Sequence, residues 1–557
     1  MHGAWGIERK AGGRGLNRRH TWTHADEDTW TRWLAALPRL TCLLLRYVCS
    51  RPPGTMLPFK RREGRFHGLL KGTPSSRFRR RERDLFVVSR SESKILACVA
   101  WLWLFRARSS PAIAQARPAT GPLRVLSANP RYFTDGSGRA IYLAGSHNWQ
   151  NFQDNGHRLA GGQDPPTCFD YDAYLDFLQA HGHNFFRLWR WETPKWTDVQ
   201  PEGVIKYCRP HPWVRSGPGM ASDGKSKFDL SRFDPSYFDR MRTRLIAARD
   251  RGIYVSIMLF EGWELQCTDA WTYHPFNLNN NVNGIDADAN GDGRGLEFNT
   301  LQHSEMGKRV LALQEAYVRK IIDAVNDLDN VLYEVCNEAG RDSTDWQYYI
   351  INFIRTYEFG KPKQHPVGMT FQGKGGTNEL LYKSPADWIS PNPGGAEESY
   401  RDDPLPAPGT RRRDRWLSKI RTLPLLSSIW PTMGSLSPGK VIVNDTDHLW
   451  GHTGGDSVWV WKSFCRGLNV LFMEELPSSP TWQDSARAAM GQTRRYSEKM
   501  NLAAMVPSND LAETKYCLAD AGKEFLVFQP GNKGGSSPLS VDDRFNLSRP
   551  EQTTPPE

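Results

Sequence analysis

The sequence lacks features that define several common classes of protein. Its main apolar stretch, Ile95–Phe105, has 11 residues, whereas a helix needs about 20 to span a bilayer comfortably. None of the nine cysteines lies in the closely spaced CxxC pairs typical of a zinc site. No glycine-rich phosphate loop follows the first predicted strand, which disfavours an open doubly wound sheet. We therefore expect neither a stable membrane span nor a structural zinc.

An excess of one charge is also absent from most of the chain. The net charge of +11 comes from the N-terminal part, because residues 1–116 hold 23 basic and 8 acidic residues. The rest of the chain holds 49 basic and 53 acidic residues and is mildly acidic. We therefore expect no nucleic-acid partner.

The basic N-terminal part ends in a pattern typical of a secretory signal peptide. In residues 94–116, a basic residue precedes the apolar stretch, and small residues alternate at its exit. Residues 94–116 are therefore predicted to direct the protein to the periplasm or the exterior. Residues 1–93 are predicted to be a disordered basic extension, a membrane-surface tether, or the product of a start site assigned too far upstream. N-terminal sequencing of the native protein distinguishes these alternatives.

Six cysteines follow the predicted signal peptide, and export permits disulfides. Cys208 and Cys267 lie in predicted loops and are candidates for a pair, although spacing alone does not establish connectivity. Cys336 lies inside a predicted strand, where we expect a buried free thiol.

Predicted strands and helices alternate between residues 117 and 494. The helices show apolar residues three or four apart, with capping residues at their starts and glycine at some of their ends. Eight strands in such an order predict an α/β fold of the (β/α)₈ type, a TIM barrel. The predicted barrel strands are 140–149, 183–191, 253–260, 331–336, 365–371, 386–390, 440–447 and 468–474.

Residues 495–557 change in character. YCLADAGKEFLVFQPG reads as strand, turn and strand, and the end of the chain is polar and rich in proline. We therefore predict a short all-β appendage, resembling a truncated sandwich, followed by a polar tail.

The segment VLYEVCNEAG (331–340) ends a predicted strand with Asn337 and Glu338. In (β/α)₈ barrels the chemistry lies at the C-terminal ends of the strands, so Glu338 is a candidate acid/base. The seventh predicted strand, KVIVNDTDH, supplies Asp445 and Asp447, which share one face because they are two residues apart. A pair of carboxylates that flank a bond is typical of a glycosidase.

These motifs resemble glycoside hydrolase family 5, the cellulase family, and its wider clan. The second strand of that family ends in Asn-x-x-Arg, here Asn184 to Arg187, and the fourth ends in Asn-Glu, here Asn337-Glu338. More narrowly, residues 122–530 are similar to bacterial secreted cellulase-like proteins that carry a C-terminal collagen-binding-type domain. HPFNLNNNVNGIDADANGDG, NDTDHLWG and NLAAMVPSNDLAETKYCLADAGKEFLVF carry this narrower resemblance.

The resemblance assigns roles and shows one departure. It implies that Glu338 is the acid/base and that Asn337 bonds a sugar 2-hydroxyl. The family nucleophile is a Glu, whereas this chain offers Asp445 or Asp447, which is one methylene shorter. Carboxylate separation decides between retention and inversion, so the stereochemical outcome stays open, with retention favoured by the resemblance. Arg187 is expected to orient a carboxylate and keep the nucleophile ionised.

Aromatic and polar residues gather at the predicted strand ends. Indole rings stack on the C–H faces of sugars, so these residues are candidates for substrate binding, although each Trp could equally fill the core. The substrate-binding candidates are His147, Asn148, Trp149, Trp189, Trp191, Trp263 and His448, with Arg187 and Asn337.

Residues 286–297, DADANGDGRGLE, match the calcium-loop pattern D-x-[DN]-x-[DN]-G-x₅-E throughout. Carboxylate and amide oxygens are the ligands that Ca²⁺ prefers, and Gly291 permits the sharp turn. The alternative is a surface loop ordered by its own Asx turns. The candidate ligands of a structural Ca²⁺ are Asp286, Asp288, Asn290, Asp292 and Glu297.

The sequence therefore favours a secreted glycoside hydrolase that acts on a poly- or oligosaccharide and needs no cofactor for its chemistry. One alternative is a non-catalytic carbohydrate- or matrix-binding protein on the same barrel, suggested by the Asp in place of Glu. Another is a metal-dependent barrel hydrolase that uses His147, His274, Asp445 and His448. The first predicted strand lacks the His-x-His that such a metal site usually shows.

Overall fold

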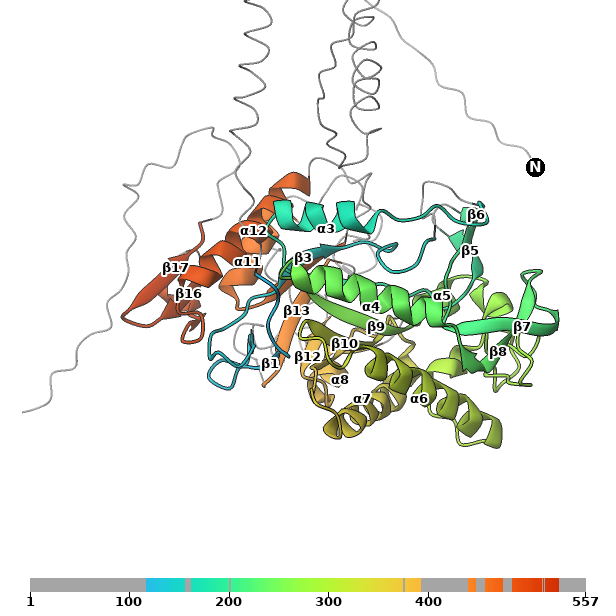
Figure 1. The fold of residues 1–557 in the computed structure, drawn as a ribbon. Helices are drawn as coiled ribbons and strands as arrows, with labels where there is room; N and C mark the ends of the chain where they lie inside the picture. Colours follow the sequence, from blue (N-terminus) through green and yellow to red (C-terminus); the bar gives the residue numbers. More distant parts are fainter. Residues whose placement is uncertain are drawn as a thin grey trace, which may run out of the picture. The chain divides into compact units, whose positions relative to one another are not determined.

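The computed structural model describes most of the chain between residues 117 and 529, and Figure 1 shows its fold. The predicted extension 1–93, the predicted signal peptide 94–116 and the polar tail lie outside the described residues, as do Asp447 and His448. No helix in the described part is long and apolar enough to cross a membrane. The described residues are 117–155, 162–199, 202–373, 376–391, 439–446, 456–473, 483–512, 514 and 516–529.

Eight strands form one parallel sheet, which confirms the predicted (β/α)₈ barrel. Seven neighbouring pairs are hydrogen-bonded in parallel, and the last strand pairs with the first. In the order in which they follow along the chain, the strands are β3 (Ala144–His147), β4 (Phe185–Leu188), β9 (Tyr254–Glu261), β10 (Val331–Asn337), β11 (Val367–Thr370), β12 (Trp388–Ser390), β13 (Val441–Asp445) and β14 (Asn469–Met473).

Asn184 joins the two strands at the remaining gap between β3 and β4. Its backbone N–H donates to the Ala144 carbonyl, and its side-chain Oδ1 accepts the Ala144 N–H, both at 2.9 Å. Its Nδ2 donates to the Tyr142 carbonyl at 3.0 Å. Gly145 permits this approach, because the Phe185 carbonyl lies where a Cβ of residue 145 would stand. The first residue of the Asn-x-x-Arg motif therefore closes the barrel.

Helices cover the outside of the barrel, and several begin where the sequence predicts. Asp234 caps one helix and is followed by Pro235, while Ser304 caps the longest. Helix α6 contacts both α4 and α7 on the outside (Figure 1). The helices are α3 (Tyr171–Ala180), α4 (Pro235–Asp250), α5 (Trp263–Cys267), α6 (Glu305–Val325), α7 (Thr344–Phe359), α8 (Asn378–Lys383), α11 (Ser457–Cys465) and α12 (Asp484–Lys499).

The inside of the barrel changes from apolar to charged along the strands. Phe185, Leu332 and Val443 belong to one buried apolar cluster, together with Trp388. Two residues later on the same strands stand Arg187, Glu334 and Asp445, all of them buried. Because side chains two apart on a strand share a face, the charged layer lies directly above the apolar one, toward the C-terminal ends.

The sequence did not predict two hairpins between β4 and α4. The second hairpin leaves most of its side chains partly or fully exposed, so it shows no apolar alternation that would reveal it. The hairpins consist of β5 (Lys195–Val199) with β6 (Glu202–Tyr207) and β7 (Trp213–Met220) with β8 (Ser226–Phe233).

The predicted strand–turn–strand of the C-terminal appendage is present. Strand β16 (Cys517–Asp520) pairs antiparallel with β17 (Glu524–Val527) and with β15 (Val506–Pro507). Cys336 is a buried free thiol, as expected. The candidate disulfide is not formed, because Cys208 and Cys267 are both free thiols.

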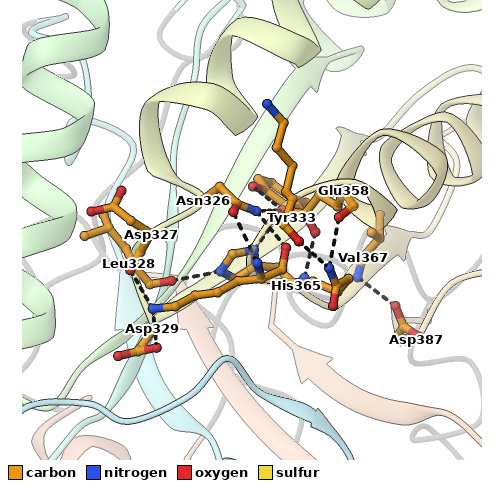
Figure 2. Close-up of polar contacts among 12 residues, drawn as sticks. Asn326, Asp327, Leu328, Asp329, Tyr333, Glu358, His365, Val367 and Asp387 are labelled. Atoms are coloured by element: carbon orange, nitrogen blue, oxygen red, sulfur yellow. Dashed lines mark hydrogen bonds and ion pairs between the residues drawn. The ribbon is translucent and has the colours of Figure 1, made fainter.

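A buried polar cluster ties the N-terminal ends of β10 and β11 to helix α7 (Figure 2). The Glu358 carboxylate contacts His365 Nδ1 at 2.8 Å and accepts from Asn326 Nδ2 at 2.9 Å and Tyr333 Oη at 3.1 Å. The other ring nitrogen of His365 lies 2.8 Å from the Leu328 carbonyl. Each ring nitrogen of His365 therefore lies beside an oxygen acceptor, and the two contacts fix the orientation of the ring.

Glu358→Ala should destabilise the fold by about 3–5 kcal/mol, because it leaves the partners of a buried ion pair unsatisfied. Urea unfolding at neutral pH measures this difference. Asp327→Ala is the matched control, since it breaks an exposed pair with Arg242 on the same side of the barrel and should change stability by less than about 1 kcal/mol. Equal effects of the two substitutions would contradict the assignment.

Candidate active site

Arg187, on β4, lies at the centre of the charged layer and bonds to side-chain oxygens of two other strands. Its Nε donates to Glu334 Oε2 at 2.8 Å, and its Nη2 also contacts the other oxygen of that carboxylate. Its Nη1 donates to Asp445 Oδ2 at 3.0 Å and its Nη2 to Asn337 Oδ1 at 2.9 Å. All four side chains are buried. One cation therefore joins the ends of β4, β10 and β13.

Glu334 was missed in the sequence reasoning, although a signal was present. It stands inside a strand in which every residue is buried. Charged side chains are almost never fully buried unless they are paired. A Glu two residues after Leu332 on a buried strand therefore predicts a buried cation on another strand of the barrel, and that cation is Arg187 on β4.

Glu338 directly follows β10 and has unusual backbone geometry. Its φ is +39°, and it is the one non-glycine residue with positive φ among the residues that the structure describes. Such a conformation costs of order 1–3 kcal/mol and persists only where the surroundings hold it. Glu338 is half-buried, unlike the seven buried residues of β10 that precede it.

Of the two candidate partners of Glu338, the structure describes Asp445 only. Asp445 ends β13, the seventh barrel strand, as predicted, and its carboxylate bonds to the Arg187 guanidinium. A fixed cation at this distance favours the ionised carboxylate, which is the form that a nucleophile requires. Asp447 and His448 lie outside the described residues.

The aromatic candidates form a connected wall beside Arg187. The Arg187 guanidinium lies 4.9 Å from the ring centroid of Trp189, in cation–π contact. Centroid distances along the wall are 5.3 Å from His147 to Trp189, 6.5 Å from Trp149 to Trp189, 5.9 Å from Trp189 to Trp191 and 6.4 Å from Trp191 to Trp263. All are buried except Trp263, so packing accounts for much of this wall.

Two side chains in the wall, His147 and Trp189, have ring nitrogens without a hydrogen-bond partner in the described part of the chain. Neither ring nitrogen of His147 has a hydrogen-bond partner among the described residues, and the same holds for Trp189 Nε1. Burial and the nearby Arg187 charge lower the pKa of His147 well below its usual value, so the imidazole is neutral. A neutral imidazole and an indole N–H can bond to hydroxyl groups. Asn148, by contrast, caps a local turn by accepting the Gln150 N–H at 2.8 Å.

Three buried glutamates beside the site form a closed ring of hydrogen bonds, which sequence reasoning missed. Glu192 donates its backbone N–H to Glu264 Oε2 (2.6 Å), Glu264 donates to Glu261 Oε2 (2.7 Å), and Glu261 donates to Glu192 Oε1 (2.9 Å). The ring touches the site through Asn337, whose Nδ2 donates to Glu261 Oε1 at 3.0 Å. Asn337 thus has one side-chain group on Glu261 and the other on Arg187.

Burial and repulsion between carboxylates raise the pKa values of Glu261 and Glu264. Burial raises the pKa of Glu264 to about 8, and burial together with Glu264 raises that of Glu261 well above its usual value. The contacts of Glu261 are all N–H donors, whereas Glu264 lies 2.7 Å from the hydroxyl of Thr193. A hydroxyl can accept from a protonated carboxyl. We therefore assign the proton of this pair to Glu264.

The predicted calcium loop brings three of its carboxylates together. Oxygens of Asp288, Asp292 and Glu297 lie within 4.8 Å of one another. Asn290 lies beside them, since its Nδ2 donates to Glu297 Oε1 at 2.7 Å. Asp286 instead caps the backbone N–H of Asp288 at 3.2 Å. Burial raises the pKa of Glu297, with smaller contributions from the charges of Asp292 and Asp288.

This acidic group is the one set of three or more potential metal ligands in the described part of the chain. His147, His274 and Asp445, which the metal-dependent alternative requires, do not form such a set there, and His448 lies outside it.

Residues 207–374 match the family model of a domain of unknown function, DUF6298, which is less than half of the chain. The search of curated proteins gives no match. Similar solved structures include a glycoside hydrolase family 5 protein from Bacteroides vulgatus. Its sequence is 13% identical, and the alignment covers 72% of this chain and 78% of that chain, with a TM-score of 0.39.

Two endo-β-1,4-mannanase structures are also similar. The enzyme from Rhizomucor miehei shows 11% identity, 69% and 100% coverage of this and that chain, and a TM-score of 0.37. The enzyme from Thermotoga petrophila shows 13% identity, 65% and 77% coverage, and a TM-score of 0.33. At these identities and TM-scores the likeness assigns no activity to this chain.

The raised pKa of Glu264 predicts a pH-dependent stability. The folded protein holds a proton that the unfolded chain releases near pH 4.5, so this contribution is fully present below about pH 4.5 and is lost as the pH rises through about 8. In Glu264→Gln, whose amide preserves both contacts, the fall in unfolding free energy across this window should be smaller. Urea unfolding at a series of pH values measures it.

Glu305→Gln is the control for this experiment, because Glu305 is exposed at the start of α6. Its unfolding free energy should follow that of wild type at every pH. A Glu264→Gln profile parallel to wild type would show that Glu264 carries no proton in the folded protein.

Proposed function

We propose that this chain is a secreted glycoside hydrolase that cleaves O-glycosidic bonds of a poly- or oligosaccharide with two carboxylates. The observation that carries the proposal is the junction at Arg187. This buried cation bonds directly to Asp445 at the end of β13 and to Asn337, the residue before Glu338, at the end of β10. The fourth and seventh barrel strands are thereby tied together at the end where barrel enzymes act.

In this proposal Glu338 is the general acid and Asp445 is its partner. Glu338 donates a proton to the leaving oxygen, while Asp445 attacks the anomeric carbon or activates a water to do so. The Arg187 ion pair keeps Asp445 unprotonated and turned toward one position. Asn337 is held at both ends of its amide, and its second Nδ2 hydrogen is suited to a sugar hydroxyl. Retention is the outcome that the family resemblance implies.

The aromatic wall supports a sugar as the substrate. Trp263 is partly exposed and lies against the buried Trp191, so its indole is a stacking surface on a rigid base. The unpartnered nitrogens of His147 and Trp189 offer bonds to hydroxyl groups. Buried polar groups without partners are unfavourable unless a ligand or water satisfies them.

Glu338→Gln should lower kcat on the natural glycan by about 100- to 10,000-fold, the usual contribution of a general acid/base. Asp445→Asn should lower it at least as far. A glycan-hydrolysis screen of residues 117–557 identifies the substrate, and steady-state kinetics then compare the variants. Asp342→Asn is the matched control, because this exposed carboxylate lies four residues after Glu338 and should leave the rate unchanged.

The screen also separates the proposal from the binding alternative. Specific glycan binding by the folded wild type without turnover, unchanged in Glu338→Gln, would replace the enzyme assignment with a carbohydrate-binding one. The departure from the family Glu at Asp445 makes this outcome informative.

We also propose that residues 286–297 bind a structural Ca²⁺ through Asp288, Asp292 and Glu297. The observation that supports it is the convergence of three carboxylates, in which Asp288 Oδ1 and Glu297 Oε2 are buried without hydrogen-bond partners in the described chain. A cation would satisfy both oxygens and neutralise their repulsion.

Calcium should raise the free energy of unfolding by about 2.7 kcal/mol at a concentration 100-fold above its Kd. Thermal unfolding after EDTA treatment, with Ca²⁺ or Mg²⁺ added back, measures the shift. Asp292→Asn should abolish the response, whereas Asp342→Asn should keep it. An identical melting temperature with EDTA and with Ca²⁺ would leave the loop held by its own turns.

A further inference from the structure

The short helix α5 donates hydrogen bonds to the backbone around the candidate acid/base, Glu338. The Gly262 N–H, at the start of α5, donates to the Asn337 carbonyl at 2.8 Å. One turn later the side-chain Nε2 of Gln266 donates to the Glu338 carbonyl. Two successive carbonyls at the end of β10 are therefore held by one helical turn from the neighbouring β9 segment.

The hydrogen bond from Gln266 is made to a residue with strained backbone geometry, Glu338. Among the described residues, Glu338 alone of the non-glycine residues has a positive φ. Such a conformation persists only where neighbouring groups hold it. Its carbonyl belongs to the peptide that would turn if the residue relaxed to negative φ. A donor fixed on that carbonyl resists the turn.

Close packing around this peptide leaves it little freedom. A Cβ added at Gly262 would lie 2.7 Å from Ala339 Cα and 2.9 Å from the Glu338 oxygen. A Cβ added at Gly373, after β11, would lie 3.2 Å from the same oxygen and 3.3 Å from the Gln266 amide. Both glycines allow their segments to close over the peptide, so β9, β10 and β11 meet at this point.

Helix α5 is itself anchored by the glutamate ring. Glu261 accepts the backbone N–H groups of Trp263 (2.9 Å) and Glu264 (2.7 Å), which are orphan donors at the start of the helix. Within α5, Gln266 Nε2 also donates to the Gly262 carbonyl at 3.1 Å. The Gln266 amide is thus pre-oriented toward the Glu338 carbonyl.

We propose that Gln266 is a positioning residue for the acid/base: its amide holds the Glu338–Ala339 peptide in the left-handed conformation and thereby sets the direction of the Glu338 carboxyl group. This inference rests on the proposed function and deepens it. Gln266 itself touches no reacting atom in this mechanism and acts through Glu338.

Two substrates that differ in their need for acid test this role in Gln266→Leu. One is the oligosaccharide that wild type hydrolyses, and the other is the 2,4-dinitrophenyl glycoside of the sugar released from it. Dinitrophenolate departs without a proton, so misplacement of the acid should matter only for the oligosaccharide. The comparison uses kcat/KM, which reports the step of glycosidic cleavage for both substrates.

We expect kcat/KM on the oligosaccharide to fall by about 10- to 100-fold, since misplacement of a catalytic group by about 1 Å costs up to about 100-fold. The value on the dinitrophenyl glycoside should change less than about threefold, and Gln266→Glu, which also removes the donor, should repeat the pattern. Gln364→Leu is the matched control, because its amide bonds backbone carbonyls at the end of α7. It should leave both values unchanged.

Equal losses on the two substrates, or no loss on either, would overturn the positioning role. If Gln266→Leu fails to fold by thermal unfolding, Gln266→Glu supplies the same comparison, and a crystal structure of either variant with Glu338 still at positive φ would also overturn it. A folded wild type without turnover on any glycan overturns the proposed function together with this inference. An active wild type with unselective losses overturns this inference alone.

Discussion

The buried ion pairs of Arg187 are the constraint on which the rest of the site depends. A guanidinium enclosed in a barrel is tolerable only if its donors are satisfied, because desolvation of a charge costs several kcal/mol. Glu334 takes two of the donors, and Asp445 and Asn337 take others. The strand ends that carry the proposed chemistry are therefore held in register by one side chain.

The molecule separates its polar clusters by position along the strands. At the N-terminal ends, Glu358 and His365 satisfy each other and leave no unusual backbone geometry behind. At the C-terminal ends, Glu338 carries backbone strain, Glu264 holds a proton near neutral pH, and the ring nitrogens of His147 have no hydrogen-bond partner among the described residues. The strained backbone of Glu338 and the raised pKa of Glu264 therefore both lie at the end where a substrate would bind, as expected where preorganisation serves function rather than stability.

Sequence reasoning succeeded where a local pattern had one structural meaning. Apolar runs bounded by caps and glycines predicted all eight barrel strands and placed Asp445 and Glu338 at strand ends. It failed for the hairpin of residues 213–233, whose strands are largely exposed and carry no regular apolar alternation. It left open whether the tryptophans lie at the rim or fill the core, and the structure buries Trp149, Trp189 and Trp191 in one packed cluster. Depth below the surface is not encoded in residue type.

By itself, the sequence determined the barrel and narrowed the proposed catalytic carboxylates to Glu338 with Asp445 or Asp447, because these inferences depend on periodicity and on position along a strand. Only the tertiary structure decided which charges meet. Three sets of contacts join residues that are far apart in the chain. They are the ion pair of Arg187 with Glu334, the hydrogen-bonded ring of Glu192, Glu261 and Glu264, and the hydrogen bond from Gln266 to the Glu338 carbonyl. Such contacts follow from the closure of the barrel, which brings the ends of distant strands to one place.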